Sequence, residues 1–177
     1  NQHQLLRYDL RTGERAAVKS WVQGAGVDYT GGSYMYYFYP DGSGTSMDIT
    51  DLKTGQTGTY AAGFPYLNNG AGLVIAGCYE GYLFVMVLEG YEADGTLIVN
   101  EYAIQPQTGQ VTLLRFKDPV TKRPLDIVAG GHGRLVVLQN QYAGNSQTSY
   151  QGTTYTIASL QDYLAGNDAF LWPEKVD

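Results

Sequence analysis

The sequence is poor in cysteine, histidine and basic residues, and each shortage excludes a class of site. The single cysteine, Cys78, excludes a disulfide within the chain and a cluster of thiolate metal ligands. With only two histidines, His3 and His132, we expect no histidine-based metal centre. Eleven basic residues against 17 acidic ones give a net charge of −6, which argues against nucleic-acid binding because phosphate contacts rely on clustered Lys and Arg.

Long apolar runs and common targeting or catalytic motifs are also missing. No apolar run approaches the ~20 residues that a membrane span needs. The first residues lack the charged and apolar segments of a signal peptide, and no Gly-x-Ser-x-Gly elbow of a serine hydrolase occurs. The hydrophobic content of 44% is ordinary for a folded protein, and 177 residues are enough for one domain.

An internal repeat is the strongest positive signal. A polar segment ending in Thr-Gly and a Glu or Gln occurs three times, at residues 8–14, 50–56 and 103–110. Its glycines, at positions 13, 55 and 109, are 42 and 54 residues apart. A second series, glycine followed by an aromatic or aliphatic run, is in phase with the first and covers residues 31–38, 80–88 and 132–138.

The local chemistry of each repeat predicts short antiparallel strands. Glycine after threonine can take the positive φ of a tight hairpin turn, and we expect the same of Gly31-Gly32, Gly81 and Gly130-Gly131. The run from Tyr82 to Leu88 is apolar on both faces, so its sheet must be covered on both sides. Each repeat thus reads as four strands.

Four-stranded units of roughly 40 to 50 residues are typical of a β-propeller. With its Asp-Leu-x-Thr-Gly segments at residues 9–13 and 51–55, the chain resembles the bladed propellers exported by Gram-positive bacteria. The resemblance implies an all-β fold and an extracellular or cell-surface location, and it identifies a shape rather than an activity. The Gly-His and Trp-Asp pairs of WD-type propellers do not occur.

We expect residues 1–177 to form a single propeller segment of about three and a half blades. Ser159 is suited to cap a short helical turn after the last strand. Propellers close with typically four to eight blades, so three interpretations stay open. They are missing N-terminal blades of the same protein, a second copy that completes the ring, and a four-bladed or open arrangement. The expected blade parts are about 4–18, 25–62, 71–116 and 125–160, followed by a tail at 161–177.

Loops between strands and between blades would gather aromatic residues on one face of such a propeller. Rigid rings with a hydroxyl suit sugar or peptide binding, although tyrosine also simply fills β-rich surfaces. The segment 117–124 holds three basic residues, which would contact an acidic partner or remain solvated. We therefore expect a non-catalytic module without a cofactor that binds a protein, peptide or glycan. The candidate binding residues are Trp21, Phe64, Tyr66, Tyr91, Tyr142 and Tyr150.

Two alternatives to a binding module stay open, an enzyme fragment and a purely structural scaffold. Asp28 and Asp126 fall on innermost strands and could line a central channel, where some propeller hydrolases and lactonases hold a metal with acidic ligands. Two carboxylates alone rarely hold a metal, and we expect Cys78 to be a packed structural thiol. Asp41 and Asp94 precede glycines in what we expect to be ordinary turns, since the ligand series of a calcium loop is absent.

Overall fold

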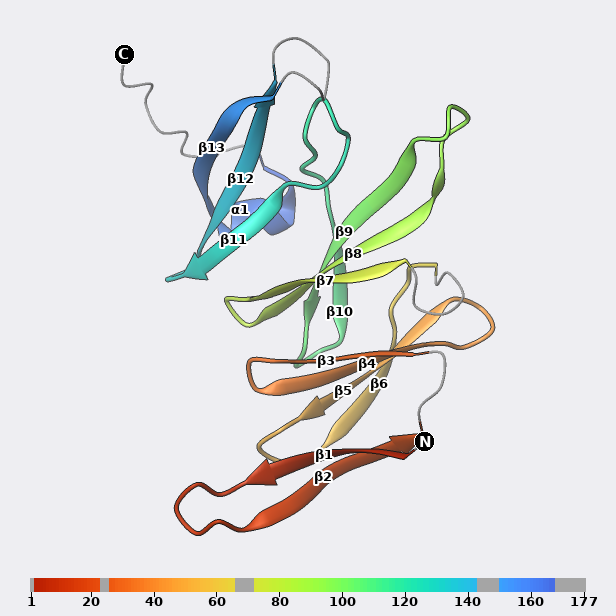
Figure 1. The fold of residues 1–177 in the computed structure, drawn as a ribbon, viewed down its shortest axis with the longest axis vertical. Coiled ribbons are helices and arrows are strands. Elements are labelled where there is room, and N and C mark those ends of the chain that lie inside the picture. Colours follow the sequence, from red (N-terminus) through yellow and green to blue (C-terminus); the bar gives the residue numbers. More distant parts are fainter. Residues whose placement is uncertain (1, 23–25, 66–71, 143–149, 168–177) are drawn as a thin grey trace. The chain divides into compact units, whose positions relative to one another are not determined.

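The computed structural model describes residues 2–22, 26–65, 72–142 and 150–167. In these ranges thirteen strands and one short helix form antiparallel sheets of two, four, four and three strands (Figure 1). The expected all-β class is therefore confirmed. The chain divides into two compact units, Asn1–Ala71 and Gly72–Asp177, each with its own sheets.

The first unit holds a hairpin and a four-stranded sheet in which each strand pairs with its neighbour in sequence. The hairpin touches the sheet through side chains: Lys19 Nζ lies 3.1 Å from an Asp48 carboxylate oxygen, and Arg7 donates to the Lys53 carbonyl. The strands are β1 (Gln2–Tyr8) and β2 (Arg15–Val22) in the hairpin, and β3 (Val27–Gly31), β4 (Tyr34–Pro40), β5 (Thr45–Asp51) and β6 (Thr57–Ala61) in the sheet.

Alternation along the strands gives the four-stranded sheet of this unit two different faces. Tyr36 and Phe38 on β4 belong to one face, where they are almost fully buried with Met47 of β5. Tyr37 pairs with Asp48 on the other face, which is the face that receives Lys19. The hairpin therefore lies against a face that is aromatic and polar rather than aliphatic.

The second unit holds a four-stranded and a three-stranded sheet around one apolar core. Phe84 and Leu135, from different sheets, are both fully buried in that core. The strands are β7 (Leu73–Tyr79), β8 (Tyr82–Tyr91), β9 (Leu97–Gln105) and β10 (Gln110–Leu114), then β11 (Asp126–Gly131), β12 (Arg134–Tyr142) and β13 (Tyr150–Ser159), followed by the helix α1 (Leu160–Ala165).

The central strand β8 is covered on both faces, as its sequence predicts. Leu83, Phe84 and Val85 are consecutive and therefore point alternately to the two faces, yet all three are fully buried. Only a strand with a packed layer on either side can bury three consecutive side chains.

The short helix after the last strand is also confirmed. Ser159 caps it, with its hydroxyl oxygen accepting from the Asp162 N–H at 3.0 Å, and Gly166 ends it in the left-handed region. Tyr163, fully buried, anchors the helix on the core with its ring centroid 5.1 Å from that of Phe116.

The Thr-Gly segments form hairpin turns with a common hydrogen-bond frame. In the first two, the carboxylates of Asp9 and Asp51 accept backbone N–H groups two and three residues ahead. The glycines that follow, Gly13 and Gly55, have φ of 75° and 77°, and their N–H groups donate to the carbonyls of the same aspartates. The expected role of these glycines is confirmed.

A fourth copy of this turn lies in the basic segment 117–124, which the sequence presents as an open loop. The Asp118 carboxylate accepts from the Val120 and Thr121 N–H groups at 2.9 and 2.7 Å. Lys122 stands where the other turns have glycine, with φ of 59°. The glycine pattern misses this copy because a lysine occupies the left-handed position.

The turn between β11 and β12 was expected at Gly130-Gly131 but lies two residues later in the chain. Gly130 and Gly131 belong to β11, and the turn consists of His132 and Gly133, with φ of 55° and 73°. A two-residue turn of this kind accepts a side chain at its first position, as Asn-Gly and Asp-Gly turns do. Gly130 instead allows Tyr79 to approach β11 closely, since a Cβ at position 130 would lie 2.8 Å from the Tyr79 Cβ.

A glycine substitution tests the turn frame. We expect Gly55→Ala to lower the free energy of unfolding by about 1 kcal/mol, because alanine in the left-handed region is strained. Gly44→Ala is the control: Gly44 lies outside that region, and its Cβ would meet only the Phe64 carbonyl oxygen at an ordinary 3.6 Å. Urea unfolding of both variants measures the difference, and an equal loss in the two would contradict the assigned turn.

Candidate functional site

Four half-buried aromatic side chains form a continuous row in the first unit. His3 on β1 lies opposite Trp21 on β2, with ring centroids 5.7 Å apart. Trp21 in turn contacts Tyr37 at 6.4 Å, and Tyr37 stacks on Tyr39 at 5.4 Å with an interplanar angle of 28°. We call these four residues the aromatic row. None of the four residues is fully buried, so we expect the row to offer some aromatic surface to solvent.

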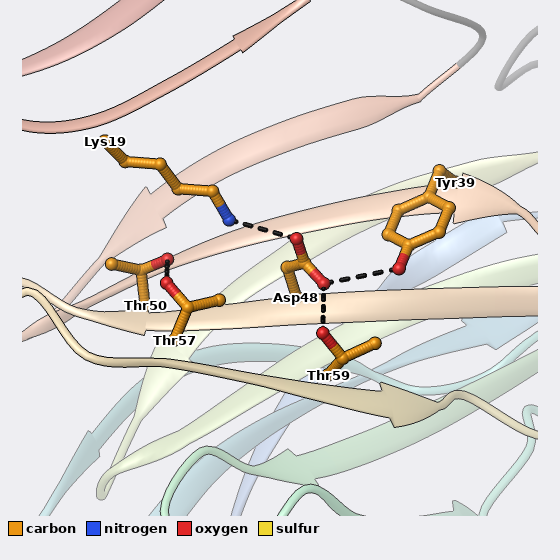
Figure 2. A network of polar contacts seen from close by, with 6 residues as sticks. All are labelled: Lys19, Tyr39, Asp48, Thr50, Thr57 and Thr59. Carbon is orange, nitrogen blue, oxygen red and sulfur yellow. Dashed lines mark hydrogen bonds and ion pairs between the residues drawn. The ribbon is translucent and has the colours of Figure 1, made fainter.

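A carboxylate joins the end of the aromatic row to charged and hydroxyl groups (Figure 2). One oxygen of Asp48 accepts from the Tyr39 hydroxyl at 3.3 Å and from Thr59 Oγ1 at 2.8 Å, and the other oxygen binds Lys19 Nζ at 3.1 Å. Burial, and then the charge of Asp48, raise the pKa of Tyr39. Tyr39 therefore keeps its proton at neutral pH and donates it to Asp48.

Strand register explains why these groups meet. Tyr37 on β4, Asp48 on β5 and Thr59 on β6 are directly opposite one another and so form one line across the sheet. Gly26 lets the chain enter β3 close to Tyr37, since a Cβ at Gly26 would lie 2.4 Å from the ring. Any side chain at this position would displace Tyr37 from the row.

The expected binding residues of the first unit have different fates. Trp21 does not lie in a loop but near the end of β2, where pairing with His3 holds it. Phe64 is 2% exposed and packs against Phe38 at 6.3 Å, so it belongs to the core of its sheet. Its apolar ring is better accommodated there than on the loop surface. Tyr66 lies outside the described residues.

The expected binding residues of the second unit stand at strand ends. Tyr91, the last residue of β8, is 65% exposed, and Tyr150, the first residue of β13, is 58% exposed. For Tyr142 the structure describes only the backbone, at the end of β12. Both tyrosines therefore stay accessible to solvent, and the Tyr150 hydroxyl lies 2.8 Å from Thr153 Oγ1.

The carboxylates considered for a channel site lie in different units. Asp28 is exposed on β3 in the first unit, and Asp126 is exposed at the start of β11 in the second. Within the described part of the chain, no group of three or more His, Cys, Asp or Glu side chains is arranged to hold a metal ion. Cys78 is half-buried on β7.

The aspartates that resembled calcium ligands accept hydrogen bonds from residues of their own turns. The carboxylate of Asp41 accepts from the N–H and hydroxyl of Ser43, the N–H of Gly44 and the hydroxyl of Ser46. These bonds, with that from Ser46 foremost, lower the pKa of Asp41 to about 2. Asp94 accepts from the Thr96 N–H at 2.9 Å, which lowers its pKa as well. Both segments are turns, as expected.

A buried carboxyl group in the second unit was not anticipated from the sequence. Glu101 on β9 is 1% exposed; one oxygen accepts a long hydrogen bond of 3.5 Å from the Tyr163 hydroxyl, and the other has no partner among the described residues. Burial raises the pKa of Glu101 to about 8, with a smaller contribution from the charge of Asp126. Because this carboxyl is closed off from solvent, we assign it to the core rather than to a binding surface.

Three members of the aromatic row were missed by sequence reasoning. His3 was considered only as a metal ligand, whereas in the structure it lies on β1, which is paired from Gln2 onward. Tyr37 was predicted only as part of the aromatic run at residues 31–38, and Tyr39, which follows that run, was not singled out. Their spacing of two residues within a strand was the available signal, since it places both rings on one face.

No protein-family model matches the chain, and comparison with curated proteins finds no significant relative. Among the described residues, no helix has both the length and the apolar character needed to cross a membrane.

Proposed function

We propose that the chain is a non-catalytic binding module that recognises a glycan through the aromatic row. The observation that supports this is the continuity of His3, Trp21, Tyr37 and Tyr39 with the carboxylate of Asp48. Ring faces pack against the C–H faces of sugars, while nearby polar groups fix the orientation of a ligand. The row supplies both kinds of surface from rigid strands.

A propeller arrangement of the sheets is part of the same proposal. Each sheet is built from strands that are consecutive in sequence and antiparallel, as the blades of a propeller are. The repeat of the Thr-Gly turns supports equivalent blades. With the resemblance to exported propellers, we propose an extracellular or cell-surface location, where a glycan ligand would be met.

Affinity electrophoresis against a panel of soluble polysaccharides tests the glycan proposal. We expect at least one glucan, mannan or xylan to retard the protein and Trp21→Ala to weaken that retardation by about 10-fold or more, since central aromatic anchors carry most of the energy of an interface. The matched control is Tyr155→Ala on β13, which removes an exposed ring outside the row.

The outcome contradicts the proposal in either of two cases. In the first, no polysaccharide of the panel retards the protein. In the second, Trp21→Ala and Tyr155→Ala weaken retardation equally, which would mean that binding does not depend on the row.

A further inference from the structure

The outer edge of β1 is unpaired among the described residues. β1 pairs with β2 along one side, and together they form a sheet of only two strands. The N–H and C=O groups along the other side of Gln2–Tyr8 therefore have no strand partner there. Such an edge is a template for a further strand.

The chain itself contains a precedent for what belongs at this edge. The β1–β2 turn repeats the β5–β6 turn bond for bond: Asp9 N–H donates to the Glu14 carbonyl at 2.9 Å, as Asp51 N–H does to that of Gln56. The strand before the turn, β5, is paired on its other side with β4 along its whole length. By this equivalence, β1 matches β5, and the place of β4 beside it is vacant among the described residues.

Two side chains next to the unpaired edge of β1 are more exposed than their equivalents in the four-stranded sheets. Tyr8 is 57% exposed, whereas its equivalents Thr50 and Ile104 are fully buried beside β4 and β8. Leu10 is 98% exposed, whereas its equivalent Leu52 is half-buried.

The backbone of Leu52 is also hydrogen-bonded to the neighbouring hairpin. Its N–H donates to the Ser33 carbonyl, in the turn between β3 and β4, at 2.9 Å. By equivalence with Leu52, Leu10 would be covered by a strand paired with β1 and by the turn that precedes that strand.

We propose that the free edge of β1 docks a β-hairpin of a partner polypeptide, built like β3–β4. One strand of that hairpin would run antiparallel to Gln2–Tyr8 and cover Tyr8. A carbonyl of its turn would accept the Leu10 N–H. The strand facing β1 would be neutral and aromatic, as Tyr34–Pro40 is, because β1 presents Gln, Leu and Tyr with Arg7 as its only charged side chain.

A second copy of the chain fits this edge less well. Two β1 strands paired antiparallel about their centres would set Gln2 of one opposite Tyr8 of the other. That pairing brings no turn to Leu10, so this side chain, which is 98% exposed, would stay uncovered.

The test uses the full chain and a synthetic peptide of residues 26–40, which carries the β3–β4 hairpin. We expect the peptide to slow hydrogen exchange of the Leu10 amide and of alternate β1 amides by 10-fold or more, and a scrambled peptide to leave them unchanged. Fusing residues 26–44 directly ahead of Gln2 should raise the melting temperature by about 3 °C or more.

Leu10→Pro is the diagnostic variant. Proline occupies the same position in two other turns of this frame, as Pro106 and Pro119, so the turn should survive while its N–H donor is lost. We expect the variant to bind the peptide at least 10-fold more weakly and to lose the thermal gain of the fusion. Leu113→Ser, which alters an exposed leucine on β10, is the control and should change neither.

Three results would overturn the inference. The first is equal protection by the scrambled peptide, and the second is a fusion with unchanged melting temperature. The third is self-association of the chain alone that Leu10→Pro abolishes in sedimentation, because the edge would then serve a second copy. None of these readouts involves a glycan, so they are independent of the proposed function.

Discussion

Replacing Glu101 with glutamine should abolish most of the pH dependence of the free energy of unfolding between pH 4.5 and 8. The pKa of Glu101 is about 8 in the folded protein, and the ordinary value is 4.5. As pH rises through this window, the unfolded chain releases the proton while the folded chain retains it, so stability falls and then levels off above pH 8. A pKa difference of this size corresponds to roughly 5 kcal/mol.

Glutamine keeps the shape of the side chain without the charge. Glu101→Gln should therefore match the wild type near pH 4 and be several kcal/mol more stable at pH 8.5, as measured by urea unfolding across the range. Glu92→Gln, which neutralises an exposed carboxylate, is the control and should leave the slope unchanged. If Glu101→Gln also left it unchanged, the carboxyl group would have to be ionised in the folded core.

Truncating Phe84 has the second largest expected effect. Phe84 is fully buried in the core that the two sheets of the second unit share, beside Leu135 and Val137 of β12. Phe84→Ala removes apolar contacts and leaves a cavity, so we expect a loss of about 4 kcal/mol in the free energy of unfolding. Urea unfolding measures the loss in the free energy of unfolding, and hydrogen exchange shows which strands lose protection.

The shared core makes the effect of Phe84→Ala non-local. We expect amides of β12 to exchange faster together with those of β8, because both strands lose the same packing. Val74→Thr is the control, because threonine has nearly the shape of valine and Val74 is largely exposed on β7. Its free energy of unfolding should stay within about 0.5 kcal/mol of the wild-type value. Faster exchange confined to β8 would show that the sheets are stabilised separately.

Local features were predictable from the sequence because their chemistry is local. Thr-Gly after an alternating strand specified the turns at Gly13 and Gly55, and Ser159 specified a helix cap. The uninterrupted apolar run of β8 predicted cover on both faces, which the burial of Leu83 to Val85 confirms. Each of these depends on a few consecutive residues.

The aromatic row was not predictable in the same way. It joins His3, Trp21 and Tyr37, which come from three strands, and strand register rather than sequence spacing brings their rings together. Glu101 is a similar case, since a polar residue in a strand of mixed composition gives no sign of its burial. Both features exist only once the sheets are packed.

The four Asp- or Gln-led turns have a consequence for how this protein can diverge or be engineered. Their frame is made by backbone groups, the first side chain and a threonine, while the two residues between vary from Leu-Arg and Leu-Lys to Pro-Gln and Pro-Val. Even the left-handed position accepts a lysine, Lys122, in place of glycine. We expect the second of the two varied positions to be the one suited to carrying foreign side chains, because Leu52 at the first position is half-buried and its N–H donates to the Ser33 carbonyl.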